Sequence, residues 1–123
     1  MKNAKVIEVY DALKSLTELS TPLPAAVNYA RAINLKRLEV FYTEFQNAKD
    51  ELLKKYGTTE DGINFTFTDE NRPLYFKEIA ELLNVDVDVN LQKINPDIVM
   101  TLELSPRQFD TIMLITKEDS EVE

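Results

Sequence analysis

The stretch from Pro24 to Gly57, PAAVNYARAINLKRLEVFYTEFQNAKDELLKKYG, decides the fold, because it predicts one uninterrupted helix over about a quarter of the chain. Pro24 suits the first position of a helix, where the missing N–H of proline is not needed. Gly57 is placed for a left-handed cap at the other end. A helix from roughly Pro24 to Tyr56 needs a partner along its length, either another part of the chain or another copy.

The apolar residues of this helix indicate where that partner lies. In its second half they recur at alternating spacings of three and four, as in a coiled-coil seam. The seam consists of Leu38, Phe41, Phe45, Ala48 and Leu52. The seam side of the helix is therefore expected to be buried.

A shorter helix precedes it, with Asn3 as the expected N-cap. Its apolar stripe consists of Val6, Val9, Tyr10, Leu13, Leu16 and Leu19. The break at residues 20–23 is short, so the two helices are expected to pack antiparallel. The first helix is long enough to cover about half of the second. Later elements or another subunit must cover the remainder, from Phe41 to Tyr56.

Two stretches after Gly57 alternate apolar and polar residues, which predicts half-buried strands. The first has Ile63, Phe65 and Phe67 on one face, and the second has Val85, Val87, Val89 and Leu91. A third helix is expected between them. Its apolar face consists of Leu74, Phe76, Ile79, Leu82 and Leu83.

Prolines and polar residues mark the ends of the later elements. The third helix is expected to begin near Thr68, with Pro73 close to its start. Pro96 is expected to interrupt regular structure. Ser105-Pro106-Arg107-Gln108 has the form of a capping box and predicts a short last helix over about 106–114.

These elements together predict a mostly helical α+β fold. An antiparallel helical hairpin with a long second helix carries a small two-stranded sheet and a short C-terminal helix. The sequence has no internal repeat and no linker-like stretch, so residues 1–116 are expected to form a single domain. Residues 117–123 are an acidic tail.

The composition excludes several kinds of chemistry. The chain contains no cysteine and no histidine. Thiolate catalysis, disulfides, cysteine-ligated metals and a histidine general base are therefore excluded. No apolar run approaches the roughly 18 residues of a membrane span. Neither a cofactor nor a membrane partner is expected.

The net charge of −8 is unevenly distributed along the chain. Residues 1–56 hold nine Lys and Arg against seven Asp and Glu, whereas residues 57–123 hold five against fifteen. The acidic half repels phosphates, which disfavours nucleic-acid binding. It either attracts a basic partner or simply keeps the protein in solution, and the composition leaves both interpretations open.

Two acidic segments are candidates for metal chemistry. Asp86 and Asp88 lie on one face of the second predicted strand, about 6–7 Å apart at their Cα atoms. Paired carboxylates bind magnesium or carry out acid–base reactions, and the alternative is the polar face of an amphipathic strand. The segment Thr59-Glu60-Asp61-Gly62 resembles part of a calcium loop but lacks its alternating acidic positions, so a turn is expected.

Four residues of the long helix are candidates for an interface. Tyr42 falls off the seam, and aromatic side chains anchor interfaces. Arg31, Lys36 and Arg37 form a basic surface that suits the acidic half of another copy. A partly buried tyrosine and a solvated basic face are the alternatives.

Several motifs together resemble a family of short, uncharacterised phage and prophage proteins. They are Leu23-Pro24-Ala25-Ala26-Val27-Asn28-Tyr29, Asn34-Leu35-Lys36-Arg37-Leu38-Glu39, Lys55-Tyr56-Gly57, Asp69-Glu70-Asn71, Glu81-Leu82-Leu83-Asn84 and Leu104-Ser105-Pro106. The similarity also includes Phe45, Ala48 and Leu52 and spans most of the chain in the same order. The resemblance implies a viral origin and action in an infected bacterium, and it transfers no catalytic residues.

The leading hypothesis is therefore a non-enzymatic phage accessory protein that acts by protein–protein contact in the host cytoplasm. It is expected to form a homo-oligomer, and a host or phage protein is a further candidate partner. The second hypothesis is a small virion or assembly component, such as a head–tail or tail-associated protein. The third is an enzyme with a metal ion held by Asp86 and Asp88.

Overall fold

The computed structural model describes residues 1–17 and 23–117 of the 123-residue chain. Over these residues the fold is α+β and mostly helical, as predicted. The elements are α1 (Asn3–Lys14), η1 (Ser15–Thr17), α2 (Ala25–Tyr56), β1 (Gly57–Thr58), β2 (Thr66–Phe67), α3 (Asn71–Leu83), α4 (Pro96–Val99) and α5 (Pro106–Met113). Residues 20–22 of the predicted break at 20–23, the stripe residue Leu19 and residues 118–123 of the acidic tail lie outside the described residues.

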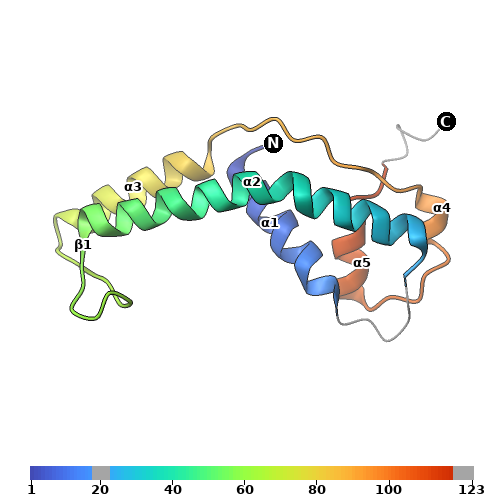
Figure 1. Ribbon diagram of the computed structural model, residues 1–123, viewed down its shortest axis with the longest axis horizontal. Helices are drawn as coiled ribbons and strands as arrows, with labels where there is room; N and C mark the ends of the chain where they lie inside the picture. Colours follow the sequence, from blue (N-terminus) through green and yellow to red (C-terminus); the bar gives the residue numbers. More distant parts are fainter. Residues whose placement is uncertain (18–22, 118–123) are drawn as a thin grey trace.

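Helix α2 is the long rod that the sequence predicts. Its 32 residues span about 48 Å at 1.5 Å per residue. Pro24 directly precedes it, and the Pro24 carbonyl accepts hydrogen bonds from the amides of Val27 and Asn28. Figure 1 shows α2 running along almost the whole length of the molecule. The positions of the other elements can therefore be described by the part of α2 that they lie beside.

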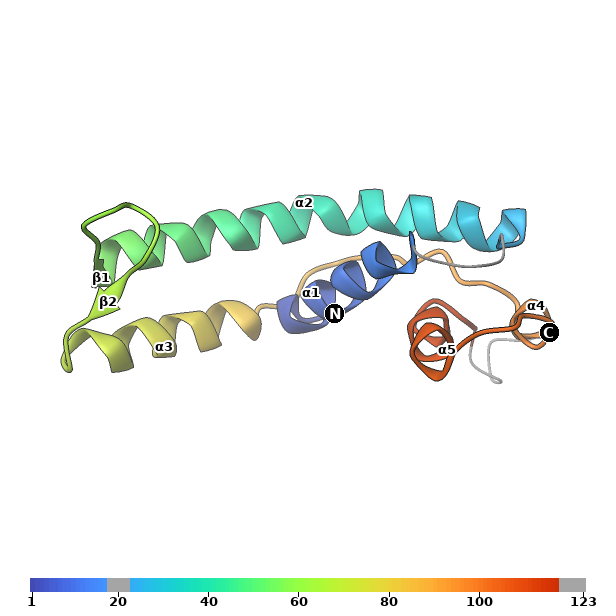
Figure 2. The same ribbon diagram turned by 90° about the horizontal axis from the view of Figure 1, so that it is seen from below.

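The first half of α2 belongs to a compact part of the molecule. Helix α1 runs in the opposite direction beneath it, with α5 next to α1 and α4 near the start of α2 (Figures 1 and 2). Their side chains form one core of Val6, Val9, Tyr10, Leu13, Leu16, Val27, Ala30, Leu38, Ile94, Val99, Ile112 and Ile115. Phe41, predicted to be a seam residue, is only partly buried at the edge of this core.

The predicted strand over residues 85–92 is wrong as a sheet strand. Its backbone is extended, and Val87, Val89 and Leu91 pack on the core as the alternation requires. Among the described residues it forms no strand of a sheet, and its start makes a single antiparallel bridge with the N-terminus, between Asp86 and Lys2. Instead, the Val87 amide donates to the Met1 carbonyl at 2.7 Å, and the side chain of Asn34 pairs with the backbone of Gln92. Hydrogen bonds to the surface of α2 and to the N-terminus thus replace those that neighbouring strands would give the backbone of this segment.

Among the described elements, α3 is the helix that packs against the second half of α2, which extends beyond the core. The two helices are antiparallel and joined at their far end by the ribbon β1–β2, with Gly57 opposite Phe67 and Thr58 opposite Thr66 (Figure 2). We call residues 44–85 the arm and the rest of the described chain the globule. Phe45 and Tyr75 are the buried apolar residues of the arm, so its interior is thin. Element α3, rather than another subunit, covers the seam beyond Phe41.

The first predicted strand is also shorter than expected. Only Thr66 and Phe67 pair with another strand, and the Ile63 side chain is 80% exposed. The small sheet therefore forms between β1 and β2, which follow each other in the chain, and not between the two stretches that alternate in the sequence. A loop of seven residues, 59–65, connects the strands, so the pairing is local.

Two expected helix boundaries are corrected by the structure. Asn3 does not cap α1; it is buried in the first turn, and its Nδ2 donates to the Leu82 carbonyl at 2.9 Å. Gly57 has φ −95°, so it is not a left-handed cap. A Cβ at this position would lie 2.7 Å from the Leu53 carbonyl oxygen. Glycine is therefore needed because the backbone of Leu53 approaches too closely for any side chain.

Pro96 behaves differently from expectation, whereas Pro73 and the last helix behave as expected. Pro96 begins α4, with Asn95 as N-cap, because proline fits the first turn of a helix. Pro73 lies inside the first turn of α3, two residues after its start. The capping box of α5 is confirmed, with Ser105 and Gln108 each bonded to the other's backbone amide.

Candidate functional site

Three of the four predicted interface residues make contacts within the chain. Arg31 Nε donates to the Leu13 carbonyl at 2.8 Å, which ties α2 to the end of α1. Arg37 Nη1 donates to the Asn90 carbonyl at 2.9 Å. These two hydrogen bonds link α2 to α1 and to the segment that contains Asn90, and Lys36 between the two arginines in the sequence is exposed.

Tyr42, predicted to fall off the seam, lies at its edge and packs against α1. Its ring stacks on that of Tyr10, with the ring centroids 4.2 Å apart. Burial, followed by the nearby Asp11 carboxylate, raises the pKa of the Tyr42 hydroxyl. Tyr42 follows the buried Leu38 by one helical turn, so it occupies the flank of the seam that faces α1.

The structure brings no third carboxylate to Asp86 and Asp88. Both side chains are exposed, and the Asp86 backbone forms a single bridge with Lys2. Over residues 1–17 and 23–117, no group of three or more His, Cys, Asp or Glu side chains is arranged to hold a metal ion. The two aspartates therefore lie on the polar face of an extended segment.

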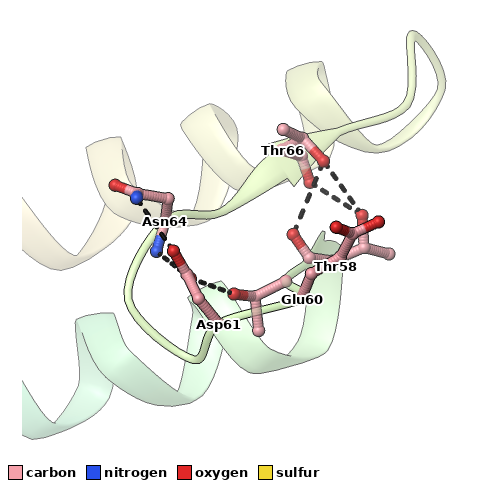
Figure 3. Close-up of a pocket in the computed structure, with 6 residues that line it drawn as sticks. Thr58, Glu60, Asp61, Asn64 and Thr66 are labelled. Carbon is pink, nitrogen blue, oxygen red and sulfur yellow. Dashed lines mark hydrogen bonds between the residues drawn. The ribbon is translucent and has the colours of Figure 1, made fainter.

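The segment from Thr59 to Gly62 is a turn organised by one carboxylate. Asp61 Oδ1 accepts from the Ile63 and Asn64 amides, both at 2.8 Å, and Oδ2 accepts from Asn64 Nδ2 at 3.0 Å. Figure 3 shows Asp61 pointing toward Asn64 across the loop, while Thr58 lies beside Thr66. These bonds, with that from Thr59, lower the pKa of Asp61 to about 2.

That turn lines a hollow of about 380 Å³ at the tip of the arm. The Asp61 oxygens that face it are already used by hydrogen bonds within the loop. Gly62 has φ +76°, a conformation that favours glycine, and it closes the turn. The arrangement is that of a structural turn, as the sequence predicts.

A groove of about 480 Å³ lies between α2 and α3 near the base of the arm. Its apolar residues are Ala48, Leu52, Leu82 and Val85, and its charged residues are Glu51, Lys55, Glu78 and Glu81. Lys55 Nζ lies 3.6 Å from Glu78 Oε2. Hydrogen bonding to Tyr56 and the charge of Lys55 lower the pKa of Glu78. The groove is apolar at its floor and mainly acidic at its rim.

A second hollow, of about 600 Å³, lies on the outer side of α3 where it meets the start of α1. It is lined by Lys2, Ala4, Lys77, Ala80, Glu81, Leu83 and Asn84. Phe76, one helical turn before Ala80 on the same face, is 57% exposed. Leu74 is 47% exposed, but it lies about 160° around the helix from Phe76, on the other flank of α3. The arm therefore presents an apolar surface on the side of α3 that faces away from α2.

Sequence reasoning assigned Leu74 and Phe76 to a buried face and so missed this surface. The signal was present in the spacing. At 100° per residue, the five apolar residues of the third helix spread over about 200° of its circumference. One neighbouring helix covers a narrower stripe than that, so part of the set had to remain uncovered.

Comparison of the chain with protein-family models, curated proteins and solved structures gave no match. Within the described part of the chain, none of the helices is both long enough and apolar enough to cross a membrane. Any function must therefore be argued from the surfaces of the globule and the arm.

Proposed function

We propose that this protein is non-enzymatic, acts by protein–protein contact and associates with copies of itself through its arm. The observation that carries the proposal is the apolar surface exposed on the outer side of α3, which includes Phe76 and Ala80. An exposed apolar residue is ordinary on its own, but apolar residues gathered on one helix face are typical of interaction surfaces.

The thin interior of the arm supports the same proposal. Two helices and a two-residue ribbon leave one side of each helix without a neighbour, and small assemblies of this kind need further packing to be stable. A second copy on the outer side of α3 would bury apolar surface at roughly 25 cal/mol per Å². Such a contact would stabilise the arm itself as well as the oligomer.

The cellular setting is proposed from the resemblance to phage and prophage proteins. In that setting the protein acts in the cytoplasm of an infected bacterium, with itself and a host or phage protein as partners. The acidic character of the arm, with nine Asp and Glu against five Lys and Arg over residues 44–85, favours a basic surface on any such further partner.

Light scattering over a range of micromolar concentrations tests the self-association. We expect a mass above the 14.2 kDa of one chain, rising with concentration. Phe76→Ser should return the mass to that of a monomer. Met100→Ser is the matched control, because Met100 is 82% exposed but lies in the globule, and it should leave the mass unchanged. A monomeric mass for the parent protein at every concentration would contradict the proposal.

A further inference from the structure

The outer side of α3 carries a regular apolar strip. Phe76, Ala80 and Leu83 follow one another at spacings of four and three, so they lie on one helix face. Tyr75 is buried and Leu82 half-buried, whereas Phe76 and Ala80 are exposed. In Figure 2 no described element covers the side of α3 that points away from α2.

A pair of opposite charges borders this strip on one flank. Lys77 and Glu81 are one turn apart, both are exposed, and both line the hollow on the outer side of α3. Ile79 lies midway between them in the sequence. The charge on this flank is therefore positive on one side of Ile79 and negative on the other.

We propose that two copies pair through this face, with their α3 helices antiparallel about a two-fold axis near Ile79. In such an isologous contact, residue i of one copy meets residue j of the other and the reverse. Lys77 of each copy then lies opposite Glu81 of its partner, so the contact contains the charge pair twice. A parallel arrangement would place like charges side by side, which is destabilising. This inference rests on the proposed self-association and specifies its geometry.

The shape of the surface fits the same arrangement. With the axis near Ile79, Phe76 of one copy is level with residues 82 and 83 of the other. At that level the outer hollow is lined by Ala4, Ala80 and Leu83, whose small or flexible side chains leave room for a ring. Phe76 of each copy therefore enters the hollow of its partner, as a knob enters a hole in packed helices.

The groove between α2 and α3 is a poorer surface for a second copy. Its rim has three glutamates, Glu51, Glu78 and Glu81, against Lys55. A two-fold contact there would bring like charges together. The outer face of α3, with one charge of each sign on its flank, is the part of the arm that complements itself.

Charge reversal tests the pairing. Lys77→Glu and Glu81→Lys each place like charges opposite one another at two positions, and each should raise the dissociation constant of the dimer at least tenfold in analytical ultracentrifugation. The double variant Lys77→Glu with Glu81→Lys restores opposite charges and should associate within about threefold of the parent. Both substituted side chains are exposed, so circular dichroism should show unchanged helicity for all three variants.

A disulfide provides an independent test, because the chain has no cysteine of its own. Ala80→Cys places a thiol one residue from the axis, and mild oxidation should give a covalent dimer. Ala32→Cys, on an exposed position of α2 in the globule, is the matched control and should remain monomeric.

The outcomes separate the two proposals. A parent protein that associates, while both single charge variants associate equally well and Ala80→Cys does not cross-link, would overturn the α3 pairing and leave self-association standing. A parent protein that is monomeric throughout would overturn both.

Discussion

The two halves of α2 have similar apolar patterns but very different surroundings. In the globule, Leu38 is completely buried in the core, whereas in the arm Leu52 is only half-buried. The difference shows that burial along a long helix is set by what covers it, since the helix itself is continuous from Ala25 to Tyr56. A single helix can thus be rigidly anchored at one end and thinly supported at the other.

This contrast predicts where the protein is stable. The globule has a core of twelve buried apolar residues, and the arm has Phe45 and Tyr75. Stability is not uniform across a structure, and parts with few buried contacts open at a lower free energy. We expect amides of α3 and of the end of α2 to exchange with solvent faster than those around Leu38.

Truncation of Leu38 should have the largest effect. Leu38 is fully buried, so Leu38→Ala opens a cavity in the globule, and the free energy of unfolding should fall by about 2–5 kcal/mol. Urea denaturation followed by circular dichroism measures the change. Leu52→Ala, the same substitution in the arm, should cost clearly less. Equal losses at the two positions would remove the distinction between globule and arm.

Removal of the Asn34 side chain should have the next largest effect. Asn34 is fully buried, its Nδ2 donates to the Gln92 carbonyl at 2.9 Å, and its Oδ1 accepts from the Gln92 amide at 2.6 Å. Asn34→Ala leaves both backbone groups of Gln92 without a partner, so we expect a loss of about 2–3 kcal/mol.

The control for Asn34 is a second asparagine of the same helix. Asn28 is exposed and donates one bond, to the Leu23 carbonyl at 3.2 Å. Asn28→Ala should cost less than about 1 kcal/mol. If thermal denaturation gave the same loss for the two variants, Asn34 would not be what holds the extended segment to α2.

Substitution of Tyr75 should have a smaller and more local effect. Its ring lies 4.7 Å from that of Phe67 and 5.4 Å from that of Phe76, so it holds the ribbon against α3. Tyr75→Ala should cost about 1–3 kcal/mol, and hydrogen exchange should accelerate in α3 but not in α1. Leu74→Ala, on an exposed neighbour, is the control. Acceleration in α1 of the same size as in α3 would show that the arm and the globule unfold together.

The smallest effect should come from the turn at the tip of the arm. Because the folded pKa of Asp61 is about 2, below its ordinary value of 3.8, its hydrogen bonds support the loop fully above pH 3.8. That support is lost as the pH falls through about 2. Carboxyl chemical shifts measured by NMR should give the midpoint, and the Ile63 and Asn64 amides should shift with it.

Asp61→Asn serves as the reference for that titration, since it removes the ionisable group while keeping one oxygen acceptor. The amide shifts of Ile63 and Asn64 should then show no transition near pH 2. A midpoint near 3.8 in the parent protein would mean that the loop bonds do not form in solution.

Several features were predictable because they depend on near neighbours in the chain. Pro24 and the apolar spacing predicted α2 to within one residue, and Ser105 with Gln108 predicted the start of α5. The fold class follows from the same signals. The exposed apolar surface of the arm was partly predictable from the sequence. The five apolar residues of the third helix spread too widely around it for one neighbouring helix to cover them all.

The sequence by itself thus determined the long helix, the start of the last helix, the mostly helical α+β class and the absence of thiol and imidazole chemistry. The tertiary structure alone decided which segments meet: Asn3 with Leu82, Asn34 with Gln92, and Tyr42 with Tyr10. The physical reason is distance along the chain. Caps and periodicity act over one or two helical turns, whereas an alternating segment such as Val85–Gln92 has the same pattern whether it joins a sheet or lies along a helix. Only the folded chain distinguishes these arrangements, and with them the surface of the arm that remains exposed.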